Sequence, residues 1–474
     1  MHLDIVVIAA YLVAINVIGL YFAKSGSMND YFLGARNIPW PVACLSIVAT
    51  ETSTLTFISI PGLAYATNMG FLQIAFGYLI GRVLVAVFML PQYFQGNFET
   101  VYQFIQNRFG VSSRRIIAIV FHVTRLLADS VRLFATAIPL TLFLGWPYWV
   151  SILVIGASTV VYTLYGGIRS VAVTDAIQFF LYLSCACVGL IIICDIMGTD
   201  PLSIVRMVPG ASLTVFSTGL ADGARSLFGS YNIISGLVGG AFLSFASHGT
   251  DHLIVQRALI CRDLPSAKKA MIGSGVLIIL QFALFLVFGL FIKALLEGRP
   301  FERSDEVLPF FIITYLPEGL RGLMLAGIFA AAMSTLSASI NSLASSTSLD
   351  ILALDRRDLP EKKKMRYAKG IALLWSVVVI GISLAFRDTK SPLVEIGLSI
   401  ASITYGGMMG MFLIGRVYDN FSERAAIGGM LASIAGTMVV VFATKVFWVW
   451  YVVIGFAIAV AAGVAIQRIA GSTK

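Results

Sequence analysis

A stretch rich in hydroxyl side chains directly follows a run of apolar residues. It reads FAAAMSTLSASINSLASSTSLDI, from Phe329 to Ile351, and nine of its residues are serine or threonine. Ala331, Ser334 and Thr335 share one face of a helix, because they are spaced by three and four residues. Such a face can supply hard oxygen ligands to a small cation, and small hydroxyl residues also allow close helix packing. The pattern leaves both roles open.

Charged residues also occur inside apolar segments. They are Glu51, Arg82, Arg125, Asp129 and Arg132. Asp129 is spaced so that it can pair with an arginine on either side of it along one helix. Charges at membrane depth are costly, so they either form closed salt bridges that lock helices together or belong to a functional site. Three arginines face two carboxylates, which leaves one positive charge that the carboxylate of a substrate could match.

Asp175 and three histidines are further candidates for a polar site. Asp175 follows GGIRSVAVT, at the start of an apolar segment, where a carboxylate either favours the helix N-terminus or serves as a cation ligand. His122, His248 and His252 have no metal-like spacing, and we expect an ordinary hydrogen-bonded role for each of them.

The composition identifies the class of protein that must position these residues. Of 474 residues, 58% are hydrophobic and only 12% are charged, whereas a soluble domain has about a quarter charged residues. The apolar runs are long and continuous, as in membrane-spanning helices, and not the short alternating segments of a membrane barrel. We therefore expect an all-α polytopic membrane protein with a single domain over residues 1–474. The net charge of +9 comes from short basic loops and predicts no nucleic-acid partner.

Thirteen transmembrane helices are expected along the chain. Their approximate positions are 3–23, 40–62, 71–92, 115–144, 147–167, 173–197, 230–255, 270–296, 321–353, 366–386, 391–415, 423–444 and 446–467. Lysine and arginine concentrate in loops such as 356–369, which the positive-inside rule places in the cytoplasm. The expected topology in the cell (inner) membrane has the N-terminus outside and the C-terminus inside.

Two of the expected spans are interrupted by residues that weaken a helix. Span 40–62 contains ATETSTLT, and span 230–255 contains several glycines followed by SFASHGTD. Glycine can simply permit close helix packing, but polar, unwound backbone at membrane depth requires a cavity beside it. Each interrupted span opens a five-helix unit, 40–197 and 230–415, and a unit with an odd number of spans must be inverted when it repeats. This arrangement is typical of secondary transporters, with the site between the two broken helices.

Three segments of the chain form a characteristic set: YGGIRSVAVTDAIQ at 165–178, HGTDHLIVQRAL at 248–259 and AAAMSTLSASINS at 330–342. Together they resemble the sodium/solute symporter family, which includes sodium/glucose, sodium/proline and sodium/sialic acid symporters. The resemblance implies a leucine-transporter-type fold: two inverted five-helix repeats, preceded by helix 3–23 and followed by two helices within 423–467.

The resemblance also implies two sodium sites. The shared first site would use backbone carbonyls and two hydroxyls, from Ala49, Thr52, Ala331, Ser334 and Thr335. Some members hold a second sodium through residues that map onto Asp175, Ser334 and Ser337. Ala338 stands where those members have the last serine of the set.

The expected solute-binding residues combine this resemblance with the charges at membrane depth. They are Glu51, Ser53, Thr56, Phe71 and Arg132. Glu51 aligns with an aspartate of proline symporters, whereas Ser53 and Thr56 align with hydroxyls of sialic acid transporters. Thr56 also stands where sugar transporters have a glutamine, which counts against a simple hexose. The arginine of sialic acid transporters falls near Ala128, one turn from Arg132.

These residues predict sodium-coupled symport of a small organic solute by alternating access. The expected solute bears a carboxylate and is a sugar acid, an amino acid or a monocarboxylate. A sodium-coupled sugar or polyol symporter is the alternative within the same class. An ion channel or sensor is the alternative of another class, although no filter-like repeat occurs. An enzyme is not expected, because no paired acid and base, metal cluster or nucleophile motif occurs. The expected partners are sodium, the solute and the lipid bilayer, and the expected functional unit is a monomer.

Overall fold

The computed structural model describes residues 2–23, 26–219, 231–386 and 393–472, and within them the chain is helical with no β-strand. The long helices are α1 (His2–Tyr21), α3 (Trp40–Glu51), α4 (Thr54–Ala66), α5 (Leu72–Leu84), α8 (Val111–Leu144), α9 (Tyr148–Met197), α11 (Gly240–Thr250), α13 (Leu264–Leu295), α15 (Leu320–Ser346), α16 (Glu361–Ala385), α17 (Leu393–Val417), α18 (Glu423–Ala443) and α19 (Tyr451–Ser472). Shorter helices are α2 (Met28–Leu33), α6 (Leu90–Gln95), α7 (Tyr102–Phe109), α10 (Pro201–Met207), α12 (His252–Leu259) and α14 (Val307–Tyr315). Short π-helical turns are η2 (Val85–Met89), η5 (Ser235–Gly239) and η7 (Thr347–Ile351).

Nine helices of the described residues are long and apolar enough to cross a membrane, or ten if the bent pair α3 and α4 is one span. The expected count of thirteen is higher and stays a prediction. Part of the difference lies in α9, which has 50 residues and corresponds to two expected spans. A straight helix of that length would measure about 75 Å, more than twice the thickness of a bilayer core.

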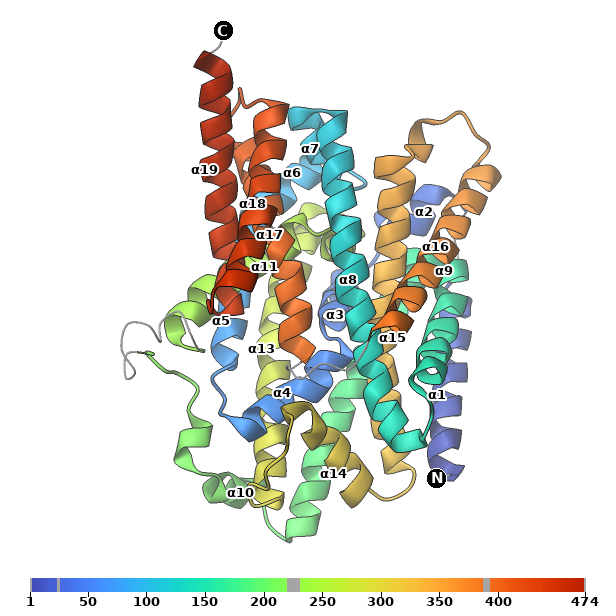
Figure 1. Cartoon of the computed structure of the whole chain (residues 1–474). Coiled ribbons are helices and arrows are strands. Elements are labelled where there is room, and N and C mark those ends of the chain that lie inside the picture. The colour runs from blue at the N-terminus through green and yellow to red at the C-terminus, as the bar shows by residue number, and fades with distance from the viewer. Residues whose placement is uncertain (1, 24–25, 220–230, 387–392, 473–474) are drawn as a thin grey trace.

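Gly167 interrupts α9 between its two halves. It has φ 59° and ψ −164°, a conformation outside the helical region and open chiefly to glycine. A side chain at this position would also come within 2.6 Å of the carbonyl oxygen of Tyr31. The break therefore falls inside the YGGIR segment, between the two spans expected there. In Figure 1 the first half of α9 rises beside α1, and the second half descends towards α10.

The interrupted span 40–62 is confirmed as a broken helix. Helices α3 and α4 meet at an angle of 67°, and Thr52 and Ser53 between them have extended backbone conformations. The second interrupted span is also broken, because Asp251 separates α11 from α12 with φ −86° and ψ 118°. Its carboxylate accepts a hydrogen bond from the backbone N–H of Leu253 at 2.9 Å, which caps α12. At both breaks the backbone leaves the helical conformation among buried residues.

The hydroxyl-rich helix α15 lies in the interior of the bundle. In an apolar stretch of 18 residues within Leu320–Ile351, 94% of the residues are buried. Helix α15 packs against α1, α8 and α9. The described chain begins at one end of the bundle with α1 and finishes at the other with α19, and the loop between α15 and α16 lies at the same end as the close of α19 (Figure 1). The burial of α15 explains why its residues are small: they allow three neighbours to approach it.

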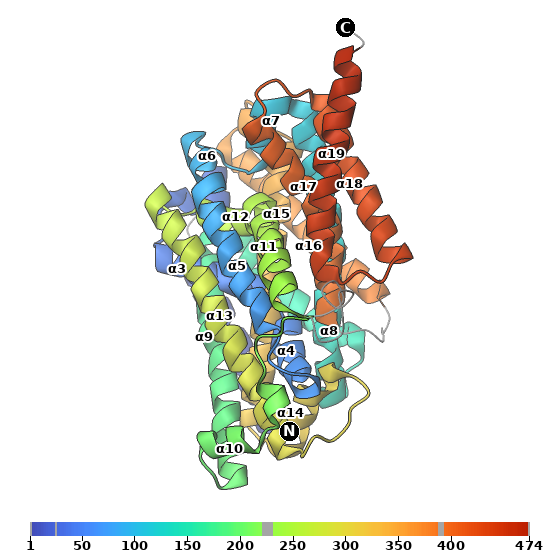
Figure 2. The ribbon, with the colours of Figure 1, turned by 90° about the vertical axis from the view of Figure 1, so that its left-hand side faces the viewer.

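Helices α5, α11 and α13 lie side by side on one face of the bundle (Figure 2). The contact between α5 and α11 is very close at Gly81, where an added Cβ would lie 2.5 Å from the carbonyl oxygen of Ala241. This packing brings α5 against the second broken span, while the side chain of Arg82 on α5 reaches the end of α3.

Candidate functional site

One cavity lies beside the break between α3 and α4. All five expected solute-binding residues line it: Glu51, Ser53, Thr56, Phe71 and Arg132. The structure therefore brings together residues that are separated by up to 81 positions in the sequence. The remaining lining residues, which sequence reasoning did not single out, are Leu55, Ile60, Tyr78, Phe282, Gly397 and Leu398.

Glu51 is held by two partners at one wall of this cavity. Its carboxylate forms an ion pair and a hydrogen bond with Arg82, and its Oε2 lies 3.6 Å from Nε2 of His248. Arg82 is fully buried and donates from Nη1 to the hydroxyl of Ser274 at 2.7 Å. The charge of Glu51 is therefore compensated inside the protein, although 19% of its side chain remains exposed.

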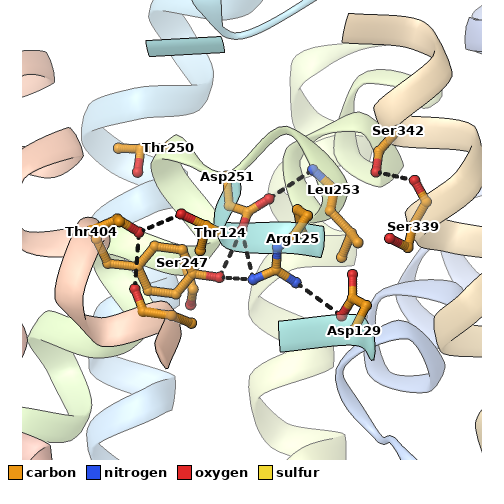
Figure 3. Close-up of polar contacts among 12 residues, drawn as sticks. Thr124, Arg125, Asp129, Ser247, Thr250, Asp251, Leu253, Ser339, Ser342 and Thr404 are labelled. Atoms are coloured by element: carbon orange, nitrogen blue, oxygen red, sulfur yellow. Dashed lines mark hydrogen bonds and ion pairs between the residues drawn. The ribbon is translucent and has the colours of Figure 1, made fainter. Parts of the chain in front are cut away.

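Arg125 belongs to a closed cluster formed by three elements (Figure 3). Its Nη2 lies 3.0 Å from Oδ2 of Asp251 and hydrogen-bonds to the hydroxyl of Tyr405. That hydroxyl donates in turn to Oδ2 of Asp251 at 2.6 Å. Asp129 Oδ1 lies further away, at 3.7 Å from Nη1. Only 3% of the Arg125 side chain is exposed, and its charge is compensated by Asp251, although its Nε has no hydrogen-bond partner among the described residues.

Arg132 is less completely paired than Arg125. Its Nη1 donates to Oδ1 of Asp129 at 3.1 Å, whereas Arg125 contacts Asp129, Asp251 and Tyr405. The Nε atoms of both arginines lack a hydrogen-bond partner among the residues that the structure describes. Arg132 has 13% of its side chain exposed, the largest share among Arg82, Arg125 and Arg132. Among these three arginines, it alone lines the cavity of the five expected residues.

The charge count made from the sequence is wrong. It matched three arginines with two carboxylates and omitted Asp251, which lies at the break between α11 and α12 and pairs with Arg125. A fourth pair joins Arg257 and Asp175, with 3.9 Å between Nη2 and Oδ2. Each buried arginine of this group therefore has a carboxylate. Sequence reasoning could have found Asp251, because it directly follows the glycine and polar residues that indicated a broken span.

Four of the five residues expected at the first sodium site form one cluster of oxygens. The hydroxyl of Ser334 donates to the carbonyls of Ala49 at 3.0 Å and Ala331 at 3.1 Å. The hydroxyl of Thr335 donates to the carbonyl of Ala331 at 3.2 Å. Thr52 lies at the adjoining break, where its side chain hydrogen-bonds to Gln281. Buried hydroxyl and carbonyl oxygens from α3 and α15 form a donor set that suits a hard monovalent cation.

The residues expected at a second sodium site are only partly connected. Ser337 donates to the carbonyl oxygen of Ser334 at 3.1 Å. Asp175 instead accepts from the hydroxyl of Ser46 at 2.6 Å and lies beside Arg257. Its other oxygen, Oδ1, is buried and has no hydrogen-bond partner within the described part of the chain. Asp175 thus has one oxygen available, but a guanidinium lies close to it.

Of the three histidines, His248 is the one near the cavity. His252 Nε2 lies 3.1 Å from the hydroxyl of Ser345, and His122 lies 2.8 Å from the hydroxyl of Thr347. The ordinary polar role expected for these two is therefore what the structure shows. No group of three His, Cys, Asp or Glu residues that could hold a metal ion occurs in the described ranges.

Two broken helices, a cavity beside one of the breaks and an adjoining cluster of hard oxygens are features of an ion-coupled secondary transporter. A family model for the sodium:solute symporter family matches residues 31–433. The chain belongs to this family.

Comparison with individual proteins agrees with this assignment. The chain is 27% identical to the sodium/sialic acid symporter of Aliivibrio fischeri, over 97% of this chain and 92% of that protein. It is 26% identical to the human sodium-coupled monocarboxylate transporter 2, over 91% of this chain and 71% of that protein. The solved structure of a Na⁺-coupled sialic acid symporter, substrate-bound and outward-open, is similar with a TM-score of 0.86 and 26% identity, covering 98% of both chains.

A more distant solved structure is similar in fold alone. The nucleobase-cation-symport-1 family transporter Mhp1 in a closed conformation has a TM-score of 0.59 and 14% identity, covering 95% of this chain and 96% of that one. Taken with the family assignment, these similarities identify the protein as a multi-pass membrane transporter that couples solute movement to sodium.

Proposed function

We propose that the solute is a compact monocarboxylate that binds with its carboxylate against Arg132. The observation that carries the proposal is the partly exposed, incompletely paired guanidinium of Arg132 in a cavity with a mainly apolar lining. Arginine suits a carboxylate because its planar N–H groups can bind both oxygens. Relatives named as sodium/sialic acid symporters and sodium-coupled monocarboxylate transporters support a carboxylate-bearing solute.

The apolar lining favours a monocarboxylate over a sugar acid or a polyol. Leu55, Ile60, Phe71, Phe282 and Leu398 supply much of the cavity wall. The uncharged polar groups of the wall come from two small hydroxyl residues and one tyrosine. A polyol has more hydroxyls than this wall can satisfy, and each buried group left unpaired costs about 1–3 kcal/mol. An apolar or lightly substituted carbon chain has no such cost.

The proposed first sodium site uses Ala49, Thr52, Ala331, Ser334 and Thr335. The hydrogen bonds that already join two hydroxyls of α15 to carbonyls of α3 and α15 support this assignment. The proposed second site, near Asp175, Ser334 and Ser337, is weaker because Arg257 lies beside the carboxylate.

The proposed topology has thirteen spans: one helix, two inverted five-helix repeats and two terminal helices. The N-terminus lies outside and the C-terminus in the cytoplasm. The likeness in fold to Mhp1 supports the repeat arrangement. The basic loop 356–369 begins at the end of the bundle where α19 finishes, and this supports the orientation. We propose that one chain is the functional unit, in the cell inner membrane, since the cavity and the oxygen cluster are both formed within it.

The test is sodium-dependent binding and uptake by the purified protein. A thermal-shift screen would compare short aliphatic and aromatic monocarboxylates, a sugar acid, a zwitterionic amino acid and a hexose, each in sodium and in potassium chloride. Ligand binding to the folded state raises the melting temperature, by more when the ligand concentration is higher relative to its Kd. We expect monocarboxylates to stabilise the protein in sodium and to accumulate in proteoliposomes. Stabilisation by the hexose alone would contradict the proposal.

A further inference from the structure

A second, smaller cavity lies between the oxygen cluster and the solute cavity. Thr335 of the proposed sodium site and Arg132 of the solute cavity both line it, and Asp129 lies in the same wall. Hydroxyl residues complete its polar lining: Ser53, Thr54 and Thr136. Leu133, Ala332 and Leu336 supply the apolar part of the wall. The carboxylate of Asp129 therefore shares one wall with a residue of each site.

One of the two carboxylate oxygens of Asp129 lacks a hydrogen-bond partner among the described residues. Its Oδ1 accepts from Nη1 of Arg132 at 3.1 Å, whereas its Oδ2 is buried and has no hydrogen-bond partner in the described part of the chain. Only 1% of the side chain is exposed. A buried carboxylate oxygen without a partner is costly, so this oxygen is available to a cation.

Apart from Arg132, Asp129 has one further ion-pair partner among the described residues, the more distant Arg125. Its distance to Arg125 is 3.7 Å, and Arg125 is independently neutralised by Asp251 at 3.0 Å and hydrogen-bonded to Tyr405. Asp129 can therefore leave Arg125 without leaving that guanidinium unpaired. Arg132 has no second carboxylate partner among the described residues, so it depends on Asp129 until a solute carboxylate arrives.

We propose that Asp129 is the positioning residue that couples sodium to the solute. Sodium at the Thr335 site attracts Asp129, which releases Arg132 to bind the carboxylate of the solute. This inference rests on the proposed function, because it needs a sodium near Thr335 and an anionic group at Arg132.

The balance of charge among sodium, the solute carboxylate, Asp129 and Arg132 explains the coupling. Without ligands, Asp129 and Arg132 neutralise each other. A solute carboxylate alone would leave two anions competing for one guanidinium, and sodium alone would leave an excess positive charge. With both ligands bound, sodium faces Asp129 and Arg132 faces the solute, and the group is neutral again. Net charge in a medium of low dielectric is strongly unfavourable, so each ligand favours binding of the other.

The test measures how sodium changes solute affinity in the purified protein. Isothermal titration with the monocarboxylate found in the screen would be performed in sodium and in potassium, for the parent, Asp129→Asn, Asp129→Glu and Thr335→Ala. We expect sodium to raise the solute affinity of the parent by about 5–150-fold, the usual range of coupling between two sites. In Asp129→Asn, sodium should leave the solute affinity unchanged. By reciprocity, the solute should no longer raise sodium affinity in that variant. Asp129→Glu keeps the charge and should keep the coupling.

A second measurement uses the parent protein and needs no substitution at Asp129. An arginine-selective dicarbonyl reagent would be applied in sodium and in potassium without solute, and modified peptides would be quantified by mass spectrometry. Sodium should increase modification of Arg132, because Asp129 leaves it. Arg125 is the internal control, since Asp251 pairs with it in both salts.

The outcomes separate this inference from the proposed function. Sodium-dependent carboxylate binding that persists in Asp129→Asn but is lost in Thr335→Ala would overturn the coupling role of Asp129 alone. Equal modification of Arg132 in both salts would overturn it as well. A parent protein whose carboxylate binding is independent of sodium would overturn both.

Discussion

Replacing Arg132 by glutamine should weaken binding of the carboxylate solute. Glutamine keeps hydrogen-bonding capacity and much of the length of the side chain but removes the positive charge. Arg132 lines the solute cavity, its Nε is unpartnered among the described residues, and 13% of its side chain is exposed. The lost charge-assisted contact is worth about 1.5–3 kcal/mol, which corresponds to about a 10- to 150-fold rise in Kd.

The neighbouring carboxylate adds to this effect. Without Arg132, the charge of Asp129 remains beside the solute carboxylate and repels it. The variant Arg132→Gln with Asp129→Asn removes both charges, so it should bind more tightly than Arg132→Gln alone. Contacting charged residues are generally non-additive by about 0.5–3 kcal/mol, and the double-mutant cycle measures this term.

Arg125→Gln is the matched control for Arg132→Gln. It removes the same charge from the same helix, but Arg125 pairs with Asp251 and does not line the solute cavity. Leaving Asp251 buried and unpaired should lower thermal stability, by up to about 3–5 kcal/mol, and should change solute affinity less. Affinity would be measured by isothermal titration and stability by thermal unfolding in detergent. Unchanged affinity in Arg132→Gln, together with lost affinity in a folded Arg125→Gln, would show that the two roles are reversed.

Three further predictions concern sodium and packing. Ser334→Ala and Thr335→Ala should each raise the sodium concentration for half-maximal uptake, because each removes one oxygen from the ligand shell; unchanged sodium titrations in both would assign the hydroxyls to packing. Asp175→Ala should lower the sodium Hill coefficient towards one if a second ion binds there, and a parent coefficient of one would exclude that ion. Gly81→Ala should destabilise the protein by about 1–3 kcal/mol in thermal unfolding, since its Cβ would lie 2.5 Å from a backbone oxygen of α11. Gly370→Ala is the control, because nothing lies within 4 Å of its Cβ, and equal melting temperatures would contradict the packing argument.

The sequence indicated the breaks in the two interrupted spans because helix-breaking residues are local signals. ATETSTLT marked the turn at Thr52 and Ser53, and SFASHGTD marked the turn at Asp251. Short connecting helices such as α7 and α14 were not expected, because their 8 and 9 residues are too few for the periodicity of a span to be recognised.

The partners of the charged residues could be predicted only where they share a helix. Asp129 and Arg132 are three residues apart, and their pairing follows from helix geometry. The pairing of Arg125 with Asp251, and that of Arg257 with Asp175, joins residues more than 80 positions apart. Such contacts depend on how the helices pack, and a count of charges within spans cannot reveal them. The convergence of five expected residues on one cavity came from the family resemblance as much as from the charges.

The balance of charges around the cavity bears on how many sodium ions a transport cycle needs. A tenfold sodium gradient provides about 1.4 kcal/mol, and a potential of 100 mV adds about 2.3 kcal/mol for each net charge moved. One sodium carried with a monoanion moves no net charge, so the potential contributes nothing and accumulation is limited to about tenfold. Two sodiums would provide about 5 kcal/mol for the same solute.

The environment of Asp175 determines whether that second ion can bind. Its unpartnered Oδ1 offers a ligand, but Arg257 at 3.9 Å already supplies a positive charge, and Ala338 has no hydroxyl to contribute. A cation would therefore bind there against the repulsion of a fully buried guanidinium. If the solute is the proposed monocarboxylate, we expect electroneutral symport of one sodium with one carboxylate, with a second sodium at most weakly bound. The coupling at Asp129 needs only the first ion, because one sodium and one carboxylate together restore neutrality beside Arg132.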